Sequence, residues 1–110
     1  MMTNNDLKHC EDMSEVRHEI DRIDRNIVPL LIERLHYIKE AGRIKNDRNV
    51  VRDEARVEDV VSKALAVANS KDSNAKMNAK MVEDVYRFII NWSINYDFGI
   101  WDDEHKPNKD

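Results

Sequence analysis

Residues 27–45 read IVPLLIERLHYIKEAGRIK, and this stretch decides the fold of the 110-residue chain. Its apolar residues recur every three or four positions, which is the spacing of one face of an amphipathic helix. Followed in both directions, the stripe predicts one helix from about Met13 to Lys45, roughly 50 Å long. Arg34 falls inside the stripe and Lys45 closes it, so two cations occupy positions where a core-facing helix usually carries apolar residues.

The start and the middle of this helix carry further signals. The sequence DMSEVRHE offers Asp12 or Ser14 as an N-cap, followed by carboxylates in the first turn. Pro29 lies inside the pattern, where proline removes one backbone hydrogen bond and favours a kink. Because the periodicity continues on both sides of Pro29, we predict one bent helix, with two helices as the alternative.

Two more helices are predicted after this one. The sequence NDRNVVRD (46–53) forms a first break, after which Asp53 can cap a helix over about 54–68. The sequence NSKDSN (69–74) forms a second break, followed by a helix over about 75–98. The apolar side of this last helix consists of Met81, Val82, Val85, Phe88, Ile89, Trp92 and Tyr96. Gly99 is expected to end it, residues 100–110 to form a loose tail and residues 1–11 an N-terminal arm.

The composition supports an all-α single domain over residues 1–110. Charged residues make up 36% of the chain, and only two glycines and two prolines are present, so the turns that join strands lack their usual residues. The basic residues are spread out and no apolar run is long enough to cross a bilayer, which argues against nucleic-acid binding and membrane insertion. The first 15 residues contain no apolar signal-peptide core, so a cytoplasmic protein is expected.

Metal and thiol chemistry find little support in the sequence. The four histidines, His9, His18, His36 and His105, lack metal-ligand spacing. The single Cys10 excludes an internal disulfide framework. Trp92 and Trp101 are interpreted as core and dimer aromatics.

The length of the first helix predicts a partner chain. A compact chain of this size has an expected radius of gyration of only about 13 Å. A helix of roughly 50 Å cannot bury its whole apolar stripe within such a monomer. We therefore expect a homodimer in which helices are exchanged or paired antiparallel.

The cations in the stripe suggest an anion-binding pocket. Arg34 and Lys45 are eleven residues apart, which places them within roughly 20° of one helix face and about 16 Å apart along the axis. Arg17 lies about 42 Å from Lys45 along the axis, so only an antiparallel partner helix could bring the two to one ligand. The alternative is that Arg34 snorkels to the surface or pairs with Glu33 or Asp24, and that Lys45 interacts with the helix dipole.

Four segments resemble the all-helical chorismate mutase family, including its isochorismate pyruvate-lyase branch. They are VRHEIDRID (16–24), LLIERLHYIKEAGRIK (30–45), VRDEARVEDVV (51–61) and FIINWSINYD (88–97). The resemblance implies an intertwined helical homodimer with two equivalent sites, each completed by an arginine from the other chain. It also implies a small dianionic substrate, chorismate or isochorismate, and no cofactor or metal.

The resemblance implies specific roles for the residues at matching positions. Arg17 would be the arginine donated across the dimer, and Arg34 would hold the carboxylate of the enolpyruvyl side chain. Lys45 would contact that carboxylate and the ether oxygen of the breaking bond. Three further positions match substrate contacts of the family. Asp53 matches an acidic residue near the ring hydroxyl, Arg56 an arginine over the site, and Ser93 a hydroxyl near the ring carboxylate.

Two positions depart from the usual family pattern. Val57 replaces a glutamate that meets the substrate hydroxyl in many mutases, and the lyase branch also has valine there. Asp97 stands where bacterial members usually have glutamine and some have glutamate. That side chain must donate a hydrogen bond to the ether oxygen, and an ionised carboxylate cannot donate. Only a protonated Asp97 could serve, and the alternative is that Asp97 pairs with Lys45 or Arg56 in the empty site.

The first functional hypothesis is a dimeric chorismate mutase that forms prephenate for aromatic amino-acid synthesis, with Lys45, Asp97 and Arg34 as catalytic residues. The second is an isochorismate pyruvate-lyase, or a mutase for a related substrate, as Val57 and Asp97 would permit. The third is a non-catalytic helical dimer or regulatory binder that keeps the fold but has lost rate through Asp97.

Overall fold

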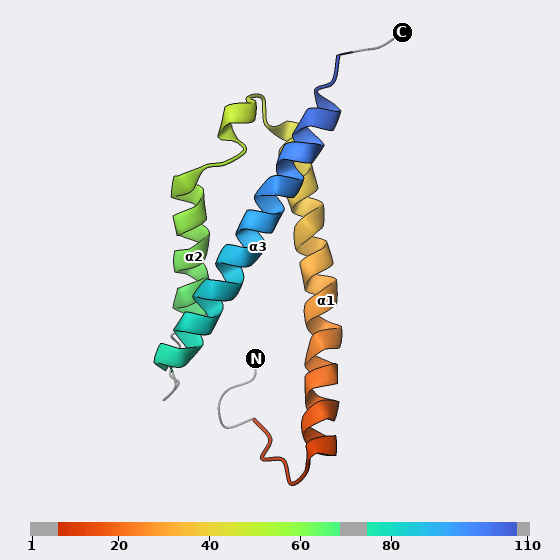
Figure 1. The fold of residues 1–110 in the computed structure, drawn as a ribbon, viewed down its shortest axis with the longest axis vertical. Coiled ribbons are helices and arrows are strands. Elements are labelled where there is room, and N and C mark those ends of the chain that lie inside the picture. Colours follow the sequence, from red (N-terminus) through yellow and green to blue (C-terminus); the bar gives the residue numbers. More distant parts are fainter. Residues whose placement is uncertain (1–6, 69–74, 108–110) are drawn as a thin grey trace. The chain divides into compact units, whose positions relative to one another are not determined.

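The computed structural model describes residues 7–68 and 75–107. Within these ranges the chain forms α1 (Met13–Ile44), the short 3-10 helix η2 (Arg48–Val50), α2 (Glu54–Ala68) and α3 (Ala75–Glu104), as Figure 1 shows. These residues contain helices and no strand, which confirms the all-α prediction. The predicted break at 69–74 lies outside the described residues.

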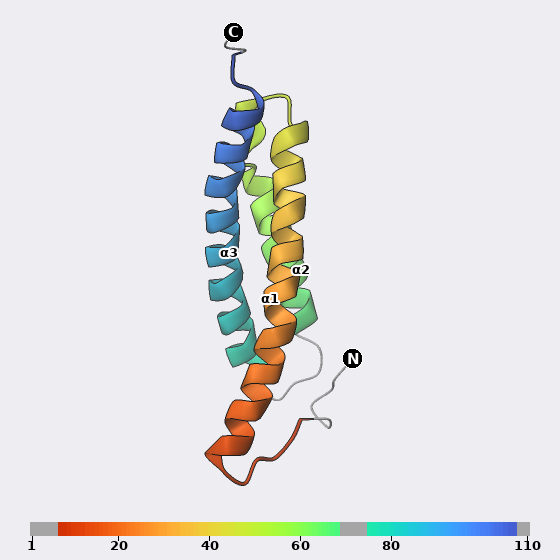
Figure 2. The same ribbon diagram turned by 90° about the vertical axis from the view of Figure 1, so that its right-hand side faces the viewer.

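Helix α1 begins and continues as the sequence predicts. Asp12 is the N-cap, because its Oδ1 accepts a hydrogen bond of 2.9 Å from the backbone N–H of Glu15. The helix runs through Pro29 without interruption (Figure 2), which confirms one helix rather than two. Lys45 follows the last helical residue, and its N–H still donates to the carbonyl of Ala41 at 3.0 Å. The bend expected at Pro29 stays a prediction.

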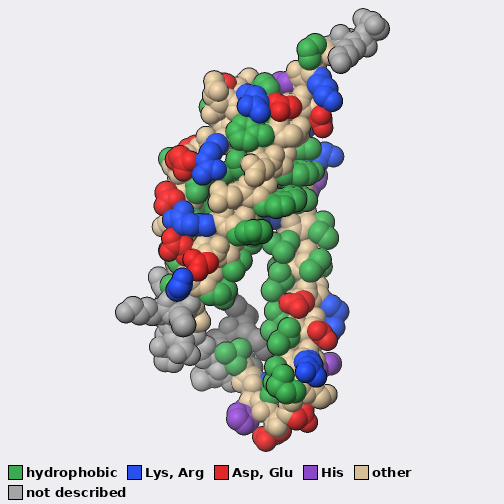
Figure 3. Space-filling view, viewed as in Figure 1, with side chains coloured by type: hydrophobic (Ala, Val, Ile, Leu, Met, Phe, Trp, Pro, Cys, Tyr) green, Lys and Arg blue, Asp and Glu red, His purple; other side chains and the backbone are tan. Residues whose placement is uncertain are grey.

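The contacts divide the chain into two compact units, residues 1–35 and residues 36–110, and α1 contributes to both. In the first unit, eight large apolar side chains of α1 are between 41% and 64% exposed. They are Met13, Ile20, Ile23, Ile27, Val28, Leu30, Leu31 and Ile32. Figure 3 shows apolar side chains gathered along this part of α1. The stripe that defines the helix in the sequence is therefore largely in contact with solvent here.

In the second unit, α2 packs against α3 around a small core of Val57, Val61 and Ile90. Val60, Leu65 and Ile94 pack against this core. At its edge Arg87 of α3 donates two hydrogen bonds, of 2.9 and 3.0 Å, to Glu58 of α2. A few apolar contacts and one bidentate ion pair therefore align these two helices.

Helix α3 continues beyond the predicted end. We expected Gly99 to end it at Phe98 and residues 100–110 to form a loose tail, but the helix extends to Glu104. Glycine costs only about 1 kcal/mol in a helix interior, and contacts made by the residues after it offset that cost. Trp101 donates a hydrogen bond to the end of α1, and Asp102 pairs with Arg48. The prediction of a single domain over residues 1–110 stays a prediction.

Among residues 7–68 and 75–107, no helix combines the length and the apolar character that a membrane span requires.

Candidate active site

Lys45 lies where α1 ends, with its ammonium directed at α3. Its Nζ donates a hydrogen bond of 2.9 Å to Oδ2 of Asp97 and one of 3.3 Å to the backbone carbonyl of Val51. The Lys45 side chain is 29% exposed, whereas that of Asp97 is 5% exposed. The sequence predicts this pairing in the empty site as the alternative to a protonated Asp97, and the structure contains the pair with Lys45.

Asp97 sits in a closely packed corner. Its Oδ1 is buried and has no hydrogen-bond partner among the described residues. A Cβ atom added to Gly42 of α1 would lie 2.5 Å from this oxygen and 2.8 Å from Cγ2 of Ile100. Only glycine therefore lets α1 approach α3 this closely. A buried carboxylate with one strong partner and one unsatisfied oxygen is costly to maintain, and such groups are found more often at functional sites than elsewhere.

Ser93 lies one helical turn before Asp97, on the same face of α3. It is buried, and its hydroxyl donates a hydrogen bond of 2.7 Å to the carbonyl of Ile89. Ser93 and Asp97 thus place two buried polar groups on one face of α3.

The predicted site residues at the start of α2 have local partners. Oδ1 of Asp53 accepts from the backbone N–H of Arg56 at 3.2 Å, so Asp53 caps α2 as the sequence predicts. The exposed guanidinium of Arg56 donates to Asp59 at 2.6 Å. Asp59 also accepts from Lys63, and the pKa of its carboxyl is lowered by the bond from Lys63 first and then by that from Arg56.

Val57 has a different environment from the other predicted site residues. Its side chain is 7% exposed and packs with Val61 and Ile90 in the core between α2 and α3. It therefore supplies helix packing and no polar group.

Arg17 and Arg34 belong to the unit of residues 1–35, whereas the other predicted site residues belong to residues 36–110. Arg17 is exposed and Arg34 is half-buried. Their approach to Lys45 stays a prediction.

Two contacts beside Lys45 were missed in the sequence. The indole Nε1 of Trp101 donates a hydrogen bond of 3.0 Å to the backbone carbonyl of Lys45. Arg48 pairs with Asp102, with 2.8 Å between Nε and Oδ1. The four-residue spacing of Asp97 and Trp101 places both on one helix face, but this signal applies only if the helix continues through Gly99.

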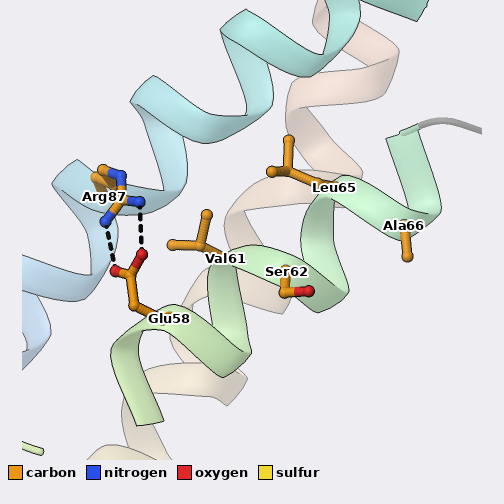
Figure 4. Close-up of a pocket in the computed structure, with 6 residues that line it drawn as sticks. All are labelled: Glu58, Val61, Ser62, Leu65, Ala66 and Arg87. Atoms are coloured by element: carbon orange, nitrogen blue, oxygen red, sulfur yellow. Dashed lines mark hydrogen bonds and ion pairs between the residues drawn. The ribbon is translucent and has the colours of Figure 1, made fainter. Parts of the chain in front are cut away.

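Two surface cavities among the described residues have linings that include neither Lys45 nor Asp97. The cavity in Figure 4 has a volume of about 410 Å³ and is lined by Glu58, Val61, Ser62, Leu65, Ala66 and Arg87. Arg87 is already paired with two carboxylates, Glu58 and Glu83, so this cavity offers no spare positive charge to a dianion. A second cavity of about 290 Å³ is bordered by Arg56 and Lys63, which share the single carboxylate of Asp59.

Among the described residues, no group of three or more His, Cys, Asp or Glu side chains is placed to hold a metal ion.

Comparisons with known proteins place these residues in a broader context. The family model of chorismate mutase type II matches residues 16–97. The chain is also similar to the isochorismate pyruvate lyase of Pseudomonas aeruginosa, with 29% identity over 92 residues that cover 84% of this chain and 87% of that protein. The range matched by the family model contains every predicted site residue, from Arg17 to Asp97.

Proposed function

The chain belongs to the chorismate mutase type II family, and on that premise we propose that it is an enzyme that rearranges chorismate to prephenate. In this reaction one C–O bond breaks while one C–C bond forms within a single molecule, so no atom enters or leaves. The reaction needs no nucleophile, metal or cofactor. The protein's task is to hold a flexible dianion in its compact conformer and to stabilise the negative charge that develops on the ether oxygen.

The observation that carries this proposal is the position of Lys45. Its ammonium lies beside the buried carboxylate of Asp97 at the end of α1, where a cation can meet the substrate's ether oxygen. An ammonium has three N–H donors, and Asp97 and the carbonyl of Val51 accept two of them. The third can donate to the substrate. In a partly desolvated site such a charge-assisted bond is stronger than in water.

Asp97 takes the second role at the ether oxygen. In the empty site its ionised form accepts the bond from Lys45. A role at the ether oxygen requires the protonated form of Asp97. The protonated group can then donate to the ether oxygen, whereas the ionised group would repel the developing charge.

The remaining binding roles are proposed from the family positions. Arg34 holds the enolpyruvyl carboxylate, and the partner chain contributes Arg17. The ring hydroxyl and ring carboxylate are met by side chains at the start of α2 and on α3: Asp53, Arg56 and Ser93. Val57 packs in the core, so the substrate hydroxyl meets no carboxylate at that position.

We also propose that the enzyme is a homodimer in which the second copy covers the exposed apolar side of α1. Eight large apolar residues between Met13 and Ile32 are at least 41% exposed. Large apolar residues of α3 are exposed as well, namely Met81, Val85, Phe88 and Trp92. Two apolar helix faces of this extent on one small chain favour burial against a second copy.

A direct assay tests the mutase proposal. Purified protein is mixed with chorismate, and the loss of its ultraviolet absorbance is followed between pH 4 and pH 8. We expect first-order conversion to prephenate, with Lys45→Ala as an inactive control. Absence of turnover across this range, in a folded dimer, would leave a non-catalytic binder as the better description.

A second candidate function is the elimination of pyruvate from isochorismate to form salicylate. It is favoured by the similarity to the Pseudomonas aeruginosa isochorismate pyruvate lyase and by the valine at position 57. This elimination also passes through a cyclic transition state, so the same Lys45 could serve it. Salicylate fluorescence with isochorismate as substrate separates the two, and the larger kcat/KM identifies the principal reaction.

A further inference from the structure

The last turns of α3 contact both the side-chain ammonium and the backbone carbonyl of Lys45. Its ammonium is bound by Asp97 and its backbone carbonyl by the indole of Trp101. Asp97 and Trp101 are four residues apart, so they project from the same face of α3 one turn from each other. One short segment of α3 thus fixes both the backbone and the side-chain end of Lys45.

The contact to the carbonyl has a clear physical role. The last carbonyls of a helix have no partner within that helix. The chain leaves the α-helical path after Lys45, and the 3.0 Å bond from Trp101 Nε1 supplies the partner that the next turn would have provided. Without this bond, the end of α1 would be free to fray or to hydrate.

Neighbouring contacts reinforce this arrangement. Ile100 lies against Gly42, one turn before Lys45 on α1. On the other side, Arg48 is held by Asp102 through two bonds of 2.8 and 3.3 Å. The segment Asp97–Asp102 therefore contacts the chain before, at and after Lys45.

We propose that Trp101 is a positioning residue that fixes the backbone of Lys45 and thereby directs its ammonium toward Asp97 and the reacting ether oxygen. This inference rests on the proposed function for its effect on rate. Its structural part stands on the hydrogen bond from Trp101 to Lys45 and can be measured without a substrate. Trp101 thus serves the site through Lys45 rather than by touching the substrate.

The test compares the chain's two tryptophans. Trp101→Phe keeps an aromatic ring but removes the indole N–H. Trp92→Phe makes the same change on the same helix, at a residue that is 52% exposed in the single chain and belongs to the proposed dimer face, so it is compared only after the dimer has been verified. We expect Trp101→Phe to lower kcat about five- to tenfold, the factor that corresponds to the loss of one hydrogen bond, with a smaller change in KM.

Two further readouts require no turnover. In the indole NMR spectrum of the wild type, the Trp101 indole proton should exchange with solvent several-fold more slowly than that of free tryptophan. The rate of Lys45 acetylation by acetic anhydride, followed by mass spectrometry of its peptide, should rise several-fold in Trp101→Phe and stay unchanged in Trp92→Phe.

The outcomes separate the two proposals. Exchange of the Trp101 indole proton at the rate of free tryptophan, or unchanged Lys45 acetylation in Trp101→Phe, would overturn the positioning role whatever the activity. Slow exchange and increased acetylation in a protein that turns over neither substrate would support the positioning role while refuting the proposed function. The exchange measurement uses the wild type, so it decides even if Trp101→Phe fails to fold.

Discussion

The ammonium of Lys45 and the carboxylate of Asp97 lie 2.9 Å apart across the contact between α1 and α3, although they are 52 residues apart in the sequence. Asp97 is 4% exposed, and its second oxygen has no partner among the described residues. This pair joins a cation suited to an anionic substrate to an acid whose role depends on whether it carries a proton. Its chemistry underlies the first prediction.

Asp97→Gln should raise mutase activity near neutral pH. A glutamine amide donates a hydrogen bond at every pH, whereas an ionised Asp97 only accepts. We expect kcat at pH 7 to rise at least tenfold, in line with the value of one donor at a developing oxyanion. No gain at pH 7 in a folded variant would exclude the donor role of Asp97.

Mixing two inactive variants should restore activity if each site is shared between chains. Arg17→Ala and Lys45→Ala each damage both sites of a homodimer. After subunit exchange, half of the dimers are mixed and have one intact site of two, so activity should reach about a quarter of the wild-type value. The unmixed variants serve as controls. Continued inactivity after exchange has been verified by mass spectrometry would contradict the shared site.

The two glycines should respond oppositely to alanine. Gly42→Ala places a methyl group 2.5 Å from Asp97 Oδ1 and against Ile100, so it should destabilise the fold by about 1–3 kcal/mol. Gly99→Ala meets nothing within 4 Å and lies inside α3, so it should stabilise by about 0.5–1 kcal/mol. Urea unfolding of both variants and the wild type measures the difference. Equal effects would show that α1 does not approach α3 as closely as described.

Acid should weaken the contact between α2 and α3. The hydrogen bond from Arg87 holds the pKa of the Glu58 carboxyl below its usual 4.5. A lowered folded-state pKa gives stability that is present above the unfolded value and is lost as the pH falls through the folded value. The wild-type protein should therefore have a larger free energy of unfolding than Glu58→Gln at pH 6. This difference should shrink below about pH 4.5.

A double-mutant comparison identifies the source of this effect. In an Arg87→Gln background, Glu58→Gln should have little pH-dependent effect, because the partner that lowers the pKa of Glu58 is gone. Urea unfolding from pH 7 to pH 3 measures all four proteins. A difference that persists in that background would assign the pH dependence to another carboxylate.

Local signals explain what the sequence could predict. The N-cap at Asp12 and the three-to-four periodicity locate α1 to within one residue, and the cap at Asp53 locates α2. The end of α3 could not be found in this way. Gly99 is a strong local stop signal, but its cost is outweighed by contacts of Trp101 and Asp102 with residues more than 50 positions away.

The sequence could predict which residue types belong to the candidate site, but not which contacts these residues make. The seam position of Lys45 and the acid at position 97 are visible in the sequence. Their pairing depends on the register of α1 against α3, which periodicity does not specify. The core position of Val57 was missed for the same reason, because a valine at the start of a helix can face either a ligand or a neighbouring helix.

The close approach of Gly42 to Asp97 has an evolutionary consequence. The side of Asp97 that faces α1 has no room for another atom, so a longer side chain at position 97 can extend only toward Lys45 and the carbonyl of Val51. Position 42 must then stay glycine while position 97 changes, and an alanine acquired first would close that route. Because the two side chains would compete for one space, we expect the effects of substitutions at positions 42 and 97 to be coupled rather than additive.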